Sequence, residues 1–301
     1  MRLAHDVDKD VLEALEAYED WRRLQRDTRA QLLVTVGGLD FGAALVEPTL
    51  AALAAFDVRC EVLQPDELER RFPAVAAHRQ PAVFQPDAAI GLADVTLRVL
   101  AADATRHGAE IRERTPVLSL AQREGGVELQ SAEGRIEARA VVLAAGGWIG
   151  ELAVQAGMPL PLQPTLQTAV HIALAHAPVG SVPTIVEQTA DGRLFYAAPS
   201  PGGGEIKGGW HAPGPPADLD GARDLDDAQV VAFEGWAARR YRGLGARTDA
   251  YGCIYTWLPG DRFHLAPRGR VVVVSCCSGR GFKFVPRTGR LAAEFAREVA
   301  G

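Results

Sequence analysis

Apolar and polar residues alternate with different patterns in different segments of this chain, and these patterns predict helices in some segments and strands in others. Between residues 10 and 29, apolar side chains recur at helical spacing opposite a charged face, which predicts an amphipathic helix. The runs 140–144 and 271–274 are wholly apolar, and such runs predict strands buried on both faces of a sheet. Glycines and a predicted helix follow each of the two runs.

The rest of the pattern predicts an α/β chain, α+β overall, in which two lobes interleave. Further helices are expected at residues 43–58, 64–69, 93–107, 226–242 and 291–299. Further strands are expected at residues 31–36, 110–114, 116–123, 127–130, 135–140, 170–175, 184–188, 194–198 and 206–210. The glycines at 125–126 and 134 predict hairpin turns. We expect one lobe of about residues 1–35, 91–158 and 260–301, and a mostly antiparallel β lobe of about residues 36–90 and 159–259.

The composition narrows the class of protein. With 301 residues, 48% apolar and 23% charged, the chain has the make-up of an ordinary globular protein. A net charge of −6 argues against a nucleic-acid surface, and no apolar run is long enough to span a membrane. The start of the chain has no signal-peptide core, and its four cysteines have no metal spacing. We therefore expect no metal, reduced thiols and a place in the cytoplasm.

The segment Ser278-Gly279-Arg280-Gly281-Phe282-Lys283-Phe284 is the strongest candidate for chemistry. It follows the four valines of the run 271–274 and precedes the expected helix at 291–299. A strand, a glycine-rich turn and a helix present backbone N–H groups to an anion or an electron-rich ring, and glycine permits positive φ or close approach. Here a lysine lies among the donors.

Four separated motifs resemble one family. They are Arg2-Leu3-Ala4-His5, Val142-Leu143-Ala144-Ala145-Gly146-Gly147-Trp148, Cys253-Ile254-Tyr255-Thr256 and the turn 278–284, with residues 161–164 as a further match. In order and spacing they resemble the monomeric sarcosine oxidase and N-methyltryptophan oxidase group of FAD-dependent amine oxidases. That group belongs to the D-amino-acid-oxidase-like flavoproteins. The resemblance implies an FAD-binding Rossmann-like lobe interleaved with an antiparallel substrate lobe.

The resemblance implies how FAD is held. It makes Cys253 the covalent attachment point of FAD, which requires a lowered thiol pKa; the alternative is a buried free cysteine. The residues that it places beside the cofactor are Val117, Ala145, Gly146, Trp148, Cys253, Gly279, Gly281, Phe282 and Lys283. Trp148 and Trp257 also suit a packing role.

The resemblance further implies a catalytic set. Lys283 and Arg2 correspond to the cations that hold a substrate carboxylate, and Lys207 corresponds to the lysine that activates oxygen. Tyr196, His211 and Tyr255 correspond to residues at the substrate site. Alternative interpretations are a solvated Lys283, an Arg2 that only lies near the terminus, and a His211 satisfied by ordinary hydrogen bonds.

The chain departs from the family pattern at its start. The family opens with a strand, a Gly-x-Gly-x-x-Gly turn and a helix that seat the FAD pyrophosphate, and no glycine cluster here has that spacing. We therefore expect an N-terminally incomplete FAD lobe. A misplaced start, a partner chain that supplies the unit, and a degenerate fragment are the three explanations. Arg262-Phe263-His264 and Cys276-Cys277 also depart from the family and leave the substrate open.

The expected function is oxidation of the C–N bond of a secondary or N-methylated amino acid. FAD would accept the hydride, O₂ would reoxidise the flavin to give H₂O₂, and water would hydrolyse the imine. One alternative is a non-catalytic remnant or subunit that needs a partner or an upstream segment. Another is an FAD-dependent dehydrogenase with a different acceptor. The expected partners are a small amine and O₂, with no nucleic acid and no membrane, and the oligomeric state stays open.

Overall fold

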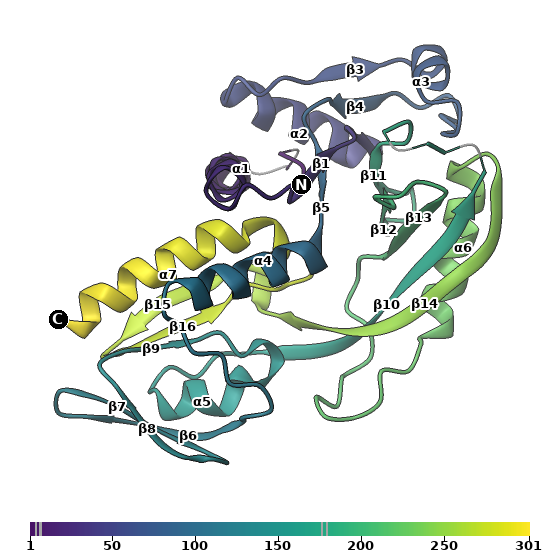
Figure 1. Ribbon diagram of the computed structural model, residues 1–301. Helices are drawn as coiled ribbons and strands as arrows, with labels where there is room; N and C mark the ends of the chain where they lie inside the picture. The colour runs from purple at the N-terminus through teal and green to yellow at the C-terminus, as the bar shows by residue number, and fades with distance from the viewer. Residues whose placement is uncertain (4, 6–7, 176, 179) are drawn as a thin grey trace. The chain divides into compact units, whose positions relative to one another are not determined.

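The computed structural model describes residues 1–3, 5, 8–175, 177–178 and 180–301 as a mixed α/β fold (Figure 1). The helices are α1 Asp8–Thr28, α2 Ala43–Ala55, α3 Pro65–Arg71, α4 Ala93–Arg106, α5 Ile149–Gln155, α6 Asp227–Arg240 and α7 Val285–Ala300, with 3₁₀ turns η1 Gly146–Trp148, η2 Pro259–Asp261 and η3 Gly281–Phe284. The strands are β1 Leu33–Thr35, β2 Gly38–Phe41, β3 Glu61–Leu63, β4 Ala82–Gln85, β5 Ala89–Gly91, β6 Val117–Arg123, β7 Gly126–Ser131, β8 Gly134–Ala138, β9 Val141–Leu143, β10 Gln163–Leu174, β11 Thr184–Gln188, β12 Leu194–Pro199, β13 Glu205–Trp210, β14 Leu244–Trp257, β15 His264–Arg268 and β16 Val271–Ser275. Ala4 of the first motif lies outside the described residues.

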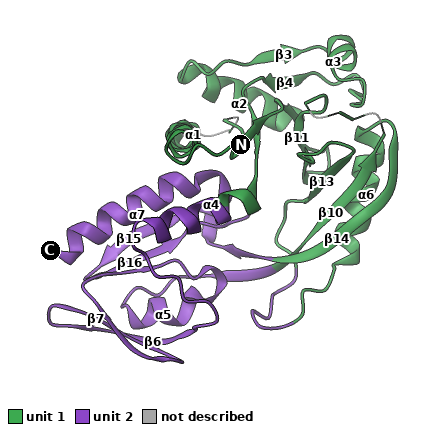
Figure 2. Cartoon of the chain, viewed as in Figure 1, with its two compact units in different colours: residues 1–96, 166–214, 222–253 green, residues 97–165, 215–221, 254–301 purple. Residues whose placement is uncertain are grey.

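The chain forms two compact units, shown in green and purple in Figure 2. Unit 1 comprises residues 1–96, 166–214 and 222–253, and unit 2 comprises residues 97–165, 215–221 and 254–301. Each unit therefore gathers segments that are far apart in the sequence. The assignment of one lobe to FAD and the other to the substrate stays a prediction.

An eight-stranded sheet organises unit 1, with the strand order β14-β10-β13-β12-β11-β2-β4-β3. Burial alternates strictly along β11 and β12, as the two-residue period of a strand requires. One face packs on α6, where Phe195 stacks on Trp236 with ring centroids 5.4 Å apart. The other face carries half-exposed side chains, among them Tyr196 and Lys207.

Helix α6 begins at a well-defined cap. The Asp226 carboxylate accepts hydrogen bonds from the backbone N–H groups of Ala228 at 2.9 Å and Gln229 at 3.3 Å. Such a cap satisfies donors that have no partner within the helix and contributes about 1 kcal/mol. The cap fixes the end of α6 from which Val230 and Phe233 extend into the core.

Unit 2 contains two three-stranded sheets, β15-β16-β9 and β6-β7-β8. Strand β16 runs parallel to β9 and antiparallel to β15. Val272 and Val274 pack with Ala292 of α7, whereas Val271 and Val273 pack in the cluster that contains α5. The four valines are therefore buried on both faces, which confirms the strand predicted there.

Three predictions about elements need correction. Residues 110–114 form no strand, because this charged segment is exposed and Arg112 pairs locally with Glu110. Val142 of β9 is 41% exposed, so β9 is not buried on both faces as its apolar sequence suggested. Helix α7 begins at Val285, six residues earlier than predicted, because η3 leads directly into it. Within the described part of the chain, no helix is long and apolar enough to cross a membrane.

Candidate active site

The carboxyl ends of the parallel strands β9 and β16 lie at one edge of their sheet in unit 2. Val271 pairs with Val141 and Val273 with Leu143, so both strands end at the same level. A turn with positive φ follows each strand: Gly146 has φ +56° after β9, and Gly279 has φ +67° after β16. Ligands of open α/β sheets bind at the carboxyl ends of the strands, so both predicted glycine turns lie where a ligand is expected.

The turn after β16 leaves no room for a side chain at one position. A Cβ on Gly281 would lie 1.8 Å from the carbonyl oxygen of Cys276, so no other residue is tolerated without movement. The Ser278 N–H donates to the Thr256 carbonyl at 3.0 Å, and the Thr256 N–H donates to the Cys277 sulfur at 3.3 Å. These bonds fix the turn to the end of β14.

Lys283 lies in η3, directly before the N-terminus of α7. Its ammonium group is 5.2 Å from the ring centroid of Phe284, which is 1% exposed and itself contacts Phe263. The N-terminus of a 16-residue helix carries partial positive charge, and Lys283 adds a full charge beside it. This end of unit 2 is therefore suited to an anion. The half-buried Phe282 lies in the same turn.

The residues after β9 form the other predicted cofactor contacts. Ala145 precedes η1, Gly146 is exposed, and the 49% exposed Trp148 donates its indole N–H to Asp220 at 2.9 Å. Val117 opens β6 and is 37% exposed. Trp257, by contrast, is buried and donates to Thr165 at 2.7 Å, which gives it a packing role.

The half-exposed face of the sheet in unit 1 carries Lys207 and Tyr196. Lys207 of β13 pairs in register with Ala198 of β12, and its ammonium lies 4.9 Å from the centroid of the Tyr251 ring. Tyr196 pairs with Gly209, and a Cβ on Gly209 would lie 3.2 Å from the Tyr196 hydroxyl oxygen. Glycine at position 209 therefore leaves room for the Tyr196 ring along the strand beside Lys207.

Three other predicted residues lie in unit 1. Arg2 donates to the carboxylate of Asp40, which is 1% exposed. His211 directly follows β13, and its backbone N–H donates to the Leu194 carbonyl at 2.7 Å. Cys253 is a half-buried cysteine on β14 and is not in a disulfide. Tyr255, further along β14 in unit 2, packs on Trp257 with ring centroids 5.8 Å apart.

Each unit thus brings together part of the predicted site. Unit 1 places Lys207 and Tyr196 on one face of its sheet, and unit 2 brings the turns of Gly146, Gly279 and Gly281 to one sheet edge. The roles that the resemblance implies for these residues stay predictions.

The sequence interpretation missed a polar group beside Lys207. His171 of β10 lies directly opposite Lys207, and its Nδ1 is 3.0 Å from Glu205 Oε1. The hydroxyl of Ser200 is the main cause that lowers the pKa of Glu205, with smaller contributions from His171 and Thr248. The alternation of residues 170–174 places His171 on the less buried face of β10, so this signal was available.

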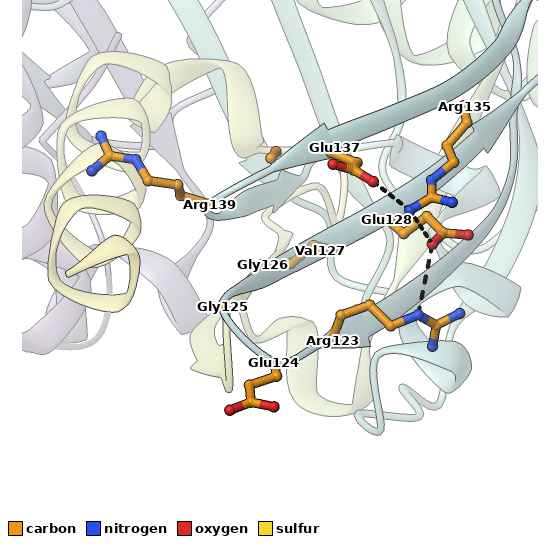
Figure 3. Close-up of a pocket in the computed structure, with 10 residues that line it drawn as sticks. Arg123, Glu124, Gly125, Gly126, Val127, Glu128, Arg135, Glu137 and Arg139 are labelled. Atoms are coloured by element: carbon orange, nitrogen blue, oxygen red, sulfur yellow. Dashed lines mark hydrogen bonds and ion pairs between the residues drawn. The ribbon is translucent and has the colours of Figure 1, made fainter.

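The hollow drawn in Figure 3 is a different place on unit 2. It has a volume of about 490 Å³ and is formed by β6, β7 and β8. Arg135 lies 3.1 Å from the Glu128 carboxylate, and Arg123 lies 3.6 Å from the same group. The charged side chains of this hollow neutralise one another, and none of the predicted site residues lines it. In the described ranges, no cluster of three or more His, Cys, Asp or Glu side chains is placed to hold a metal ion.

Glycine turns at the carboxyl ends of a parallel strand pair are typical of α/β proteins that bind a nucleotide cofactor. The chain belongs to the FAD-dependent oxidoreductase family of the D-amino-acid-oxidase type, whose model, "DAO: FAD dependent oxidoreductase", matches residues 8–295. It is an enzyme of this class, and FAD is its cofactor. The family resemblance of the sequence motifs is thereby confirmed.

Two curated relatives cover nearly the whole chain. The chain is 26% identical over 302 residues to monomeric sarcosine oxidase of Bacillus sp. (strain NS-129), a match that covers 94% of this chain and 77% of the relative. It is also 26% identical over 316 residues to N-methyl-L-tryptophan oxidase of Yersinia pestis (strain Pestoides F), which covers 99% and 82%. The chain is thus similar to enzymes named for small N-methylated amines.

Solved structures confirm the fold class. NikD, described as an unusual amino acid oxidase essential for nikkomycin biosynthesis, matches with a TM-score of 0.85 and 24% identity over 99% of this chain and 82% of its own. L-proline dehydrogenase from P. horikoshii matches with a TM-score of 0.86 and 17% identity over 99% and 81%. At these identities the likeness shows the fold alone.

The residues present fit FAD at one end of the site. Gly281 lies so close to Cys276 that a Cβ would collide, so backbone rather than side chain forms the surface of the turn there. The turn then leads into the N-terminus of α7, whose N–H groups and dipole favour negative charge. This donor set suits the edge of a ring that becomes electron-rich on reduction.

Proposed function

We propose that this enzyme oxidises the C–N bond of a secondary or N-methylated amino acid and uses O₂ as the electron acceptor. The observation that carries the proposal is the turn of residues 278–284, where Lys283 lies at the N-terminus of α7. A carboxylate-bearing substrate suits this positive end of unit 2. The names of the two curated relatives, sarcosine oxidase and N-methyl-L-tryptophan oxidase, support the substrate class.

Each predicted residue would have one task in this reaction. Lys283 and Arg2 would hold the substrate carboxylate, and N–H groups at the start of α7 would stabilise negative charge on the flavin. Tyr196, Tyr255 and His211 would line the substrate site. When bound, FAD accepts the hydride that leaves the carbon next to nitrogen and passes the electron pair to O₂.

Two further predicted residues would act on oxygen and on the cofactor. Lys207 would stabilise the negative charge that develops on O₂ during its reduction. Cys253 would tether the flavin through its thiolate. Because none of its four cysteines is in a disulfide, we also propose a reducing compartment, the cytoplasm.

Anaerobic mixing tests the proposal directly. The FAD-loaded protein is mixed with N-methylated amino acids in the absence of oxygen, and flavin absorbance is followed. We expect bleaching with a substrate, then recovery of the absorbance and one equivalent of H₂O₂ when oxygen enters. Bleaching that only an artificial dye reverses would identify a dehydrogenase. No bleaching with any amine would overturn the proposed function and favour the non-catalytic alternative.

A further inference from the structure

His171 and Glu205 form a hydrogen-bonded pair on the half-exposed face of the sheet in unit 1. His171 belongs to β10 and Glu205 to β13, and His171 Nδ1 lies 3.0 Å from Glu205 Oε1. In the strand register His171 pairs with Lys207, two residues after Glu205. The imidazole thus lies beside the lysine that the proposed function assigns to oxygen.

The surroundings of Glu205 determine which imidazole nitrogen carries the proton. The Glu205 carboxylate accepts hydrogen bonds from the hydroxyls of Ser200 at 2.6 Å and Thr248 at 2.8 Å. An ionised carboxylate only accepts, so His171 must donate through Nδ1–H. In the neutral ring the lone pair is then on Nε2. Glu205 therefore orients His171 as a base in the way that a carboxylate orients the histidine of a catalytic triad.

The charged and titratable groups packed against His171 are Glu205, Lys207 and Tyr251. The Tyr251 ring lies 6.0 Å from the imidazole, centroid to centroid, and the Lys207 ammonium lies over that same ring at 4.9 Å.

We propose that His171, oriented by Glu205, accepts the proton of the substrate ammonium group. The proposal rests on the proposed function, because a hydride leaves the carbon only when the neighbouring amine is neutral and its lone pair supports the resulting cation. The N–H bond of the ammonium breaks, an Nε2–H bond forms, and no electrons are transferred. The positive charge passes to an imidazolium that is paired with Glu205, and water later takes the proton.

The pH dependence of flavin reduction separates this role from a structural one. For His171→Gln, we expect anaerobic flavin reduction about 1000-fold slower than wild type at pH 7. The rate of this variant should rise about tenfold per pH unit and approach wild type near pH 10, where an aliphatic ammonium loses its proton in solution. High pH thus supplies the neutral amine that His171 otherwise provides.

His107→Gln is the matched control, because it makes the same substitution at an exposed histidine directly after α4 that contacts Asp103 and no residue of the proposed site. It should keep the wild-type pH profile. A loss in His171→Gln that is the same at every pH, or no loss, would overturn the inference while the proposed function stands. A wild-type flavin that no amine reduces at any pH would overturn both.

A second readout requires no turnover. In full-length protein with ¹⁵N-labelled histidine, the NMR signals assigned by their loss in His171→Gln should show the Nδ1–H tautomer. Glu205→Gln should shift this ring toward the Nε2–H form, and His107→Gln should not. An Nε2–H tautomer in the wild type would contradict the proposal, because the nitrogen assigned as the base would already carry the proton.

Discussion

Arg240 forms a bidentate ion pair with Glu187 inside unit 1: Nη2 lies 2.6 Å from Oε1 and Nε lies 2.9 Å from Oε2. Both residues are buried, and the Trp236 indole donates to the same carboxylate at 2.7 Å. The guanidinium also donates to the Ala76 carbonyl at 2.6 Å and lies over the Phe41 ring. The pair therefore joins α6 to β11 and to the loop before β4.

Removal of one partner from this pair should destabilise the protein strongly. Arg240→Met leaves the buried Glu187 carboxylate with an uncompensated charge, so the free energy of unfolding should fall by about 3–5 kcal/mol. Chemical denaturation measures it. Arg22→Met, which breaks the exposed Arg22–Glu19 pair, is the control and should cost less than about 1 kcal/mol. An equal loss of unfolding free energy in the two variants would show that the buried pair stabilises the protein no more than the exposed pair.

Gly281→Ala should damage the turn that we propose as the FAD contact of unit 2. The new Cβ would lie 1.8 Å from the Cys276 carbonyl oxygen, so the turn must move. We expect weaker FAD binding, measured by flavin fluorescence during titration, and a lower melting temperature. Gly289→Ala within α7 is the control, because nothing lies within 4 Å of its Cβ position. It should stabilise the helix by up to about 1 kcal/mol and leave FAD affinity unchanged.

The sequence predicted those elements whose pattern reflects burial. The four valines from Val271 to Val274 and the alternating strands β11 to β13 were predicted because each side chain meets the core or solvent in turn. Strand β14, Leu244–Trp257, was not predicted, because glycines and charges interrupt it and most of it is exposed or half-buried.

Only those parts of the candidate site that lie within one local sequence motif could be predicted. Glycines and a lysine marked the turn at Lys283. The His171–Glu205 pair depends on the register between β10 and β13, which no local pattern in the sequence determines. The pairing of Arg2 with Asp40 likewise joins segments that are distant in the sequence.

The stability of the protein should depend on pH through His264. Partial burial lowers the pKa of this histidine, because desolvation penalises the charged ring. The unfolded chain therefore binds the proton first, so His264 contributes stability above about pH 6.5 that is lost as the pH falls through its folded pKa. The difference in urea midpoint between wild type and His264→Gln should shrink from about pH 7.5 to about pH 5. A constant difference would contradict this linkage.

Lys207→Met should slow the reaction with oxygen more than the reaction with substrate. The ammonium group on β13 is the charge that we propose to stabilise reduced oxygen, so its loss should slow flavin reoxidation by about 10²–10³-fold. Stopped-flow mixing of reduced enzyme with O₂ measures this rate. Lys9→Met is the control, since Lys9 is exposed on α1. Unchanged reoxidation in Lys207→Met would remove Lys207 from the oxygen step.

Cys253→Ala should release the flavin if this thiol is the covalent attachment point. After acid precipitation, wild-type protein should stay yellow, whereas the variant should give a colourless pellet and a yellow supernatant. Cys60→Ala is the matched control: burial raises the pKa of the Cys60 thiol, which leaves less of the reactive thiolate at neutral pH. Its pellet should therefore stay yellow. A colourless wild-type pellet would show that FAD is held without a covalent bond, and Cys253 would then be a half-buried thiol that does not tether the flavin. Mass spectrometry of the peptide that contains Cys253 would decide between these outcomes, because a tethered flavin adds its mass to that peptide alone.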